Sequence, residues 1–203
     1  MANLETFSSG VEQKERPAVL YHASHNPDIE EFVPRNDRIR DPKEGPVVFA
    51  TPDKGLASTF LVEGHNDDWM QIGFYSGIPV VVVLMDRDSF IARDHGGTLY
   101  LLPSDSFGFD ERRGMGEKEW TSHQPVKPLA KIEHPSALDA MIENGVQVYF
   151  VDKDMFTAIR DAISSADDLG MSILESITSE NQLRGEHVVS FSKILKDAHN
   201  FKR

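Results

Sequence analysis

The sequence predicts a mixed α+β domain followed by a helical extension. Strand-like runs recur up to about residue 151, and helix start signals lie between them. Beyond residue 152 the apolar residues recur with helical spacing instead. We therefore expect a flexible lead over residues 1–16, an α+β domain over residues 17–151, and a helical extension over residues 152–203.

Several runs rich in Val, Tyr, Phe and Leu are predicted strands, because Gly, Pro, Asp or Ser bounds each of them. The run "IPVVVVLM" is continuously apolar, which predicts a central strand covered on both faces. It is also much shorter than the roughly 20 apolar residues of a membrane-spanning helix, so no membrane segment is expected. The predicted strands span residues 18–23, 46–50, 78–85, 97–102, 126–132 and 146–151.

Two helices are predicted inside the domain. Thr51 as N-cap and Pro52 at the first helical position predict a helix in "TPDKGLASTFLV". Ser136 as N-cap and Gly145 as the residue after the last turn predict a second helix in "HPSALDAMIENG". In the extension, three apolar helical faces comprise Met155, Phe156, Ile159 and Ile163; Leu169, Ile173 and Ile177; and Val188, Phe191, Leu195 and Ala198.

Composition narrows the classes of function. The chain has 203 residues, 39% of them hydrophobic, and no cysteine, which excludes disulfides, thiolate metal ligands and cysteine nucleophiles. The net charge of −12 disfavours nonspecific binding to nucleic acid, since neutralisation of phosphates supplies most of that affinity. The N-terminal residues lack the basic and apolar regions of a secretory signal, so a cytoplasmic location is expected.

Two long loops interrupt the predicted strands, over residues 34–45 and 103–120. A loop as long as the second one, inside a compact domain, is usually either functional or disordered. Glu119 lies at its end, just before a predicted strand.

Three segments stand out together: "YHAS", "VVFATPDKGLASTF" and the glutamate of "EKEWTSHQPVKPLAKI". Their order and spacing resemble the ADP-ribosyltransferase superfamily, which includes the poly(ADP-ribose) polymerases and diphtheria toxin. The similarity covers about residues 18–133. It implies a split β-sandwich with a cleft between two small sheets. It further implies NAD as a substrate and transfer of ADP-ribose to an unknown acceptor, or NAD hydrolysis.

The resemblance implies roles for residues on the first strand and before the late one. His22 and Ser24 match the histidine and serine or threonine that hold the ribose and nicotinamide amide, with Ala23 where glycine is usual. Glu119 matches the catalytic glutamate. Cleavage of the glycosidic bond passes through an oxocarbenium-like ribose, which a nearby carboxylate stabilises without a metal or a protein nucleophile.

The middle segment matches the wall of the nicotinamide pocket, with two departures. Phe49 matches the wall strand, and Ser58 lies where the family has a serine leading into a short helix. The family's tyrosines fall at Val48 and at Thr59 or Phe60, so the hydroxyl groups are missing. Phe49 and Phe60 still offer ring surfaces to nicotinamide.

Arginine suits the pyrophosphate of NAD, because its planar guanidinium binds phosphate in a bidentate manner. Arg35 and Arg38 both lie in the first long loop and are candidates for this contact. A metal site at His22 and His25 is disfavoured, because residues three apart on a strand point to opposite faces.

Other interpretations remain open. Glu119 is also explained as a solvated residue of the charged run 117–119, His22 as a satisfied strand histidine, and Phe49 as core. Tyr100 is either a cross-strand core contact or a substitute for the missing tyrosine. For the whole protein, the alternatives are a non-catalytic binding module that docks a partner or a second copy through the C-terminal helices, and an acidic assembly protein.

Overall fold

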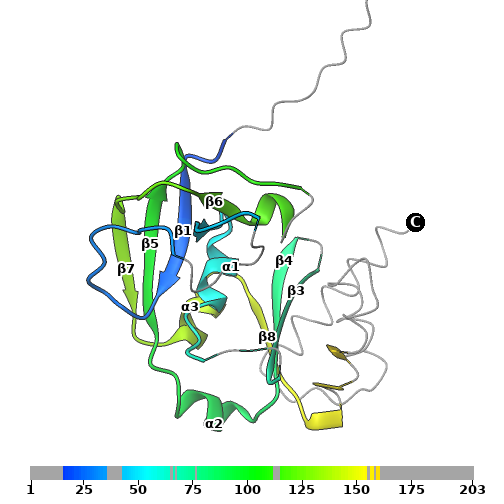
Figure 1. Ribbon diagram of the computed structural model, residues 1–203. Helices are drawn as coiled ribbons and strands as arrows, with labels where there is room; N and C mark the ends of the chain where they lie inside the picture. Colours follow the sequence, from blue (N-terminus) through cyan, green and yellow to red (C-terminus); the bar gives the residue numbers. More distant parts are fainter. Residues whose placement is uncertain are drawn as a thin grey trace, which may run out of the picture.

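Strands and short helices alternate along the chain in the computed structural model, which describes residues 16–35, 43–64, 66, 68–75, 77–111, 115–154, 156–157 and 159–160 (Figure 1). The predicted mixed α+β class is confirmed. The elements are β1 (Val19–Ser24), β2 (Val48–Ala50), α1 (Lys54–Thr59), β3 (Met70–Tyr75), β4 (Ile78–Val83), α2 (Arg87–Ile91), β5 (Gly97–Pro103), the 3₁₀ helix η1 (Gly116–Lys118), β6 (Trp120–Ser122), β7 (Ala130–His134), α3 (Ala137–Glu143) and β8 (Gln147–Phe150).

The strands form three small sheets. One sheet has the order β1-β5-β7 with antiparallel pairs throughout. Another has the order β3-β4-β8, in which β4 and β8 are parallel, and the third pairs β2 with β6. An antiparallel bridge between Tyr21 and Thr51 brings β2 beside β1, with backbone hydrogen bonds of 2.7 and 3.0 Å.

The described residues include two hydrophobic cores. In the larger core, α1 and α3 lie between the two three-stranded sheets and pack against β4 and β8 (Figure 1). The smaller core lies on the other face of β1 and β5, against β2 and β6. Strand β5 serves both cores, because Leu99 points into the larger one while Tyr100 and Leu102 point into the smaller one.

Strand β4 confirms the prediction of a central strand covered on both faces. It lies between β3 and β8, and Val80–Val83 are almost completely buried. A strand paired on both edges and covered on both faces has no polar face, which explains its continuous run of valines.

The predicted helix boundaries are right for α3 and wrong for α1. Ser136 caps α3 by accepting a hydrogen bond from the Asp139 amide at 3.0 Å, and Gly145 follows the helix with a φ of 81°. Helix α1 is capped by Asp53 instead of Thr51. Thr51 is not available as a cap, because its backbone pairs with Tyr21.

Three of the described elements were not predicted, namely β3, α2 and η1. The strand expected directly after Glu119 is only the short strand β6. The strand predicted over residues 126–132 begins later, at Ala130, and Val126 forms only an isolated bridge with Phe32. Residues 1–15 and 161–203 lie outside the described residues. The second of these ranges contains most of the predicted helical extension. Phe156 and Ile159, at its start, are buried. None of the described helices is long and apolar enough to cross a membrane.

Asp94 joins the start of α3 to the turn before β5. Its carboxylate accepts hydrogen bonds from the amides of Gly96, Ala137 and Leu138 at 2.9, 2.7 and 2.9 Å. The Ser136 hydroxyl donates a further bond of 2.9 Å. Amides at the start of a helix have no partner within the helix, so one side chain here satisfies two of them.

These contacts favour the charged form of Asp94. Burial opposes ionisation and is the largest single influence on its pKa. The hydrogen bonds from the three amides and the Ser136 hydroxyl together outweigh it, so the pKa of Asp94 lies below its ordinary value of 3.8.

We predict that Asp94→Ala lowers the free energy of unfolding by about 2 kcal/mol at pH 7, because the amides of Ala137 and Leu138 lose their acceptor. Urea denaturation measures this loss. Because the folded-state pKa is depressed, the advantage of wild type over Asp94→Asn is complete above the ordinary pKa of 3.8 and disappears as the pH falls through the folded-state pKa. Asp105→Asn, which neutralises an exposed carboxylate, is the control for the loss of one negative charge. A constant difference between wild type and Asp94→Asn over this pH range would contradict the prediction.

Candidate functional site

A cavity of about 780 Å³ opens between β1, β2, α1 and the segment that precedes β6. Its size is that of a typical small-molecule site. Nearly all of the site residues predicted from the sequence line it. They are His22, Ser24, Arg35, Phe49, Phe60 and Glu119.

The strand pairing explains why His22 and Glu119 reach one cavity although they lie far apart in the sequence. The Tyr21–Thr51 bridge places β2 beside β1, and β2 pairs with β6 so that Ala50 lies opposite Trp120. Glu119 directly precedes β6 and therefore lies next to the end of β2, where the chain passes β1. Sheet geometry thus brings the imidazole and the carboxylate to the same end of these strands.

His22 is oriented by a backbone carbonyl. Its Nδ1 lies 2.6 Å from the Phe49 carbonyl oxygen, and its ring centroid lies 4.5 Å from that of Phe32. A carbonyl only accepts hydrogen bonds, so Nδ1 must donate. In the neutral imidazole Nε2 is then an acceptor, which suits a ligand hydroxyl that donates to it.

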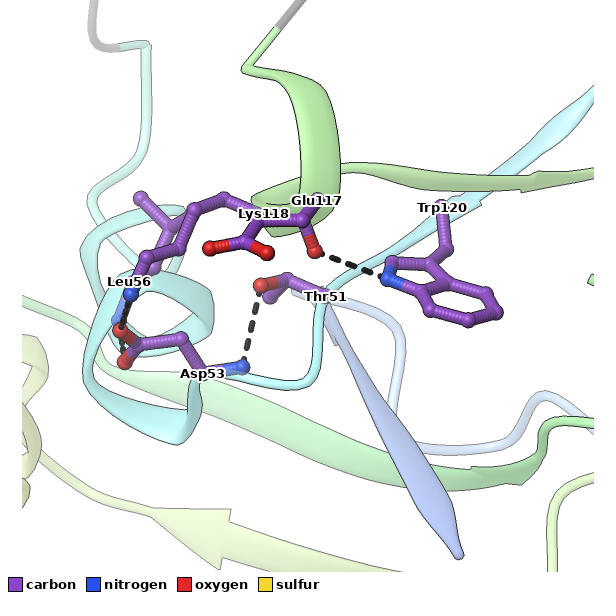
Figure 2. Close-up of polar contacts among 6 residues, drawn as sticks. All are labelled: Thr51, Asp53, Leu56, Glu117, Lys118 and Trp120. Carbon is purple, nitrogen blue, oxygen red and sulfur yellow. Dashed lines mark hydrogen bonds and ion pairs between the residues drawn. The ribbon is translucent and has the colours of Figure 1, made fainter. Parts of the chain in front are cut away.

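The residues on both sides of Glu119 make polar contacts, and Figure 2 shows those of Lys118 and Trp120. Its amide donates to the Gly116 carbonyl at 3.0 Å, and the Trp120 indole donates to the Glu117 carbonyl at 2.8 Å. The Lys118 ammonium forms an ion pair of 3.0 Å with Asp53. Glu119 is half-buried with a buried Oε1, whereas Glu117 is exposed. In this charged run it is therefore Glu117 that forms the solvated surface.

The aromatic residues fall into two groups. Phe49 and Phe60 are half-buried and line the cavity, where their rings offer apolar surface to a ligand. Tyr100 is 1% exposed, and its hydroxyl donates to the Asn26 carbonyl at 2.8 Å and accepts from the Ile29 amide at 3.0 Å. The interpretation of Tyr100 as a core contact is therefore confirmed.

Ser58 does not lie with the other predicted site residues. It is completely buried in α1, where its hydroxyl donates to the Gly55 carbonyl at 2.6 Å, and it is not among the residues lining the cavity. Ser24 lines the cavity, and its Oγ accepts a bond of 3.2 Å from the Asn26 amide. Arg35 is an exposed lining residue, whereas Arg38 lies outside the described residues.

Several lining residues were not predicted. These residues belong to no sequence motif, and only the tertiary fold brings them to the cavity. They are Glu31, Glu63, Met115 and Lys118. His25 also lines it, but its Nε2 is bonded to the Leu61 carbonyl at 2.8 Å. Within the described part of the chain, no group of three or more His, Asp or Glu side chains is arranged to hold a metal ion.

A second cavity of about 430 Å³ adjoins the first, and Val62, Glu63 and Gly64 line both. Its walls include Trp69 and Phe90, with Arg93 also lining it.

Comparison of the chain with protein-family models, with curated proteins and with solved structures found no match.

The Tyr100 hydroxyl ties β5 to the segment that leads into the cavity wall, so its loss should weaken the fold. We predict that Tyr100→Phe lowers the free energy of unfolding by about 1–2 kcal/mol, since the Asn26 carbonyl and the Ile29 amide lose their partner. Chemical denaturation measures this change. Tyr21→Phe is the control, because that ring is less buried, and it should change stability by less than about 0.5 kcal/mol. Equal losses in the two variants would contradict the prediction.

Proposed function

We propose that the protein is an ADP-ribosyltransferase-like enzyme that cleaves NAD between ribose and nicotinamide and transfers ADP-ribose to an acceptor or to water. The proposed architecture is the split β-sandwich, with the cavity as its cleft. The observation that carries the proposal is the meeting of His22, Phe49 and Glu119 in one cavity. These residues come from three separate segments, each of which resembles a different part of the same family's NAD site.

The proposed reaction requires stabilisation of a positive charge. The bond from ribose C1′ to the nicotinamide nitrogen breaks, and its electron pair neutralises the departing pyridinium ring. Positive charge develops on the ribose, where the Glu119 carboxylate is suited to stabilise it. The acceptor oxygen or nitrogen then forms a bond to C1′ and loses its proton.

The other cavity residues suit binding and orientation. The Phe49 carbonyl fixes the ring of His22, whose Nε2 accepts a hydrogen bond from a ribose hydroxyl. Ser24 helps to bind the same ribose. The rings of Phe49 and Phe60 pack against nicotinamide, and Arg35 meets the pyrophosphate. Loop 103–118 selects the acceptor, because it leads directly into Glu119. The adjoining second cavity gives the acceptor room.

A non-catalytic binding module is the second candidate, and the residues at the positions of the family's tyrosines favour it. Val48 and Thr59 are both buried, and the Thr59 hydroxyl donates to the Leu56 carbonyl at 2.7 Å. Neither side chain supplies a phenol to the cavity. A partner or a second copy would then dock through the C-terminal helices, whose residues lie almost entirely outside the described part of the chain.

We predict that the wild-type protein releases nicotinamide from NAD and that Glu119→Gln lowers the rate by about 100-fold, since a neutral amide does not stabilise the ribose cation. Chromatographic assay of nicotinamide, with and without a cell extract that supplies acceptors, measures the rate. Glu117→Gln is the matched control, because it removes an exposed carboxylate two residues away. It should retain the wild-type rate.

Two results would contradict the enzymatic proposal. One is nicotinamide release that is equal in wild type and Glu119→Gln. The other is the absence of release in either condition, together with no shift in the melting temperature on addition of NAD. The second result favours the binding module, because a transferase that awaits its acceptor should still bind NAD.

A further inference from the structure

The carboxylate proposed to be catalytic lies at the end of a short turn that has few hydrophobic contacts of its own. The turn is η1, Gly116–Lys118, and none of its residues is buried. Gly116 has a φ of 57°, and the Glu119 amide closes the turn on the Gly116 carbonyl. The position of Glu119 therefore depends in part on contacts made by the residues beside it, Lys118 and Trp120.

Lys118 supplies one such contact, and its partner belongs to another wall of the cavity. Its Nζ lies 3.0 Å from Asp53 Oδ2 (Figure 2). The same Nζ lies 5.0 Å from the centroid of the Phe74 ring. The two charged side chains are 30% and 19% exposed, so solvent screens this pair less than a pair on the open surface. Lys118 is therefore tied at once to the start of α1 and to β3.

Asp53 is itself a fixed point. Its Oδ1 accepts the Leu56 amide at 3.0 Å as the N-cap of α1, while Oδ2 accepts from Lys118. Its own amide donates to the Thr51 hydroxyl at 3.1 Å. The helix that carries Leu56 and Ala57 into the cavity lining thus shares one carboxylate with the residue next to Glu119.

We propose that Lys118 and Asp53 are positioning residues, whose ion pair holds η1 so that Glu119 is directed into the cavity. The expected effect on kcat rests on the proposed function, whereas the fixing of η1 by the ion pair does not. Misplacement of a catalytic group by about 1 Å costs as much as 100-fold in rate. Loss of the pair should therefore lower kcat while leaving NAD binding nearly unchanged, because neither residue needs to touch the substrate for this role.

The test compares four variants. Asp53→Asn removes the charge while asparagine still serves as an N-cap, and Lys118→Met keeps an unbranched apolar stem beside Phe74. The double variant Asp53→Asn with Lys118→Met tests whether the two act as a unit, and Lys118→Arg retains the cation. Lys131→Met is the matched control, because it removes an ion pair of 2.9 Å with Glu133 on the exposed strand β7.

Each single variant should lower kcat of nicotinamide release about tenfold and leave the Kd for NAD within about twofold of wild type. The double variant should be no slower than the slower single variant, because either single substitution already breaks the ion pair. Lys118→Arg should recover most of the rate, and Lys131→Met should equal wild type. Multiplied losses in the double variant would overturn the proposal. So would a raised Kd in Lys118→Met alone, since Lys118 would then bind the ligand directly.

A readout without NAD separates the inference from the proposed function. Trp120 is 7% exposed and its indole donates to the Glu117 carbonyl, so its fluorescence reports on the turn. In a Trp69→Phe background, both single variants should make Trp120 more accessible to acrylamide, and the double variant should add nothing. Unchanged quenching would overturn the positioning role. If wild type neither binds nor cleaves NAD, the proposed function fails and this measurement still decides the role of the pair.

Discussion

The two backbone hydrogen bonds between Tyr21 and Thr51 are the constraint on which the site depends. They are 2.7 and 3.0 Å long and are the bridge by which β2 lies beside β1. Because β2 also pairs with β6, this bridge fixes the distance between the strand that carries His22 and the turn that carries Glu119. It also places the Phe49 carbonyl against the His22 ring. Strand order thus brings the residues of the candidate site together, and side-chain contacts such as the His22–Phe49 hydrogen bond then orient them.

Two aspartates connect the short helices to the rest of the fold by the same physical means. Asp53 caps α1 and holds Lys118, while Asp94 satisfies the first amides of α3 from the turn before β5. Helices of this length gain little stability from their own hydrogen bonds, so their position comes from caps and packing. In both cases the unsatisfied amides of a helix start are used to fix a second segment. Asp53 therefore both caps α1 and holds η1, the turn that lines the cavity beside Glu119.

The sequence predicted those parts of the structure that rest on local pattern. The valine run of β4 and the Ser136 cap are examples, because burial on both faces and helix capping each leave a signature within a few residues. The α1 cap was placed wrongly at Thr51, since both Thr51 and Asp53 are residues that cap helices and the bridge from Thr51 to Tyr21 is not visible in the sequence. Short elements such as β6 lack a full period of any pattern. The burial of Ser58 depends on which face α1 turns to the core. The position of Lys118 depends on its contact with Asp53, which is distant in the sequence. Neither feature is visible in the sequence.

The missing tyrosines bear on substrate binding more than on the bond-breaking step. A ring that packs on nicotinamide contributes through its face, and phenylalanine presents the same face as tyrosine. What the hydroxyl adds is a hydrogen bond, typically about 1 kcal/mol, to a group that is not the centre of reaction. In the proposed reaction, charge develops on the ribose, and the group suited to meet it is the half-buried carboxylate of Glu119, which lines the same cavity as the oriented imidazole of His22. The loss of the tyrosine hydroxyls should then weaken ground-state affinity, while the barrier to cleavage depends on how firmly η1 holds its carboxylate.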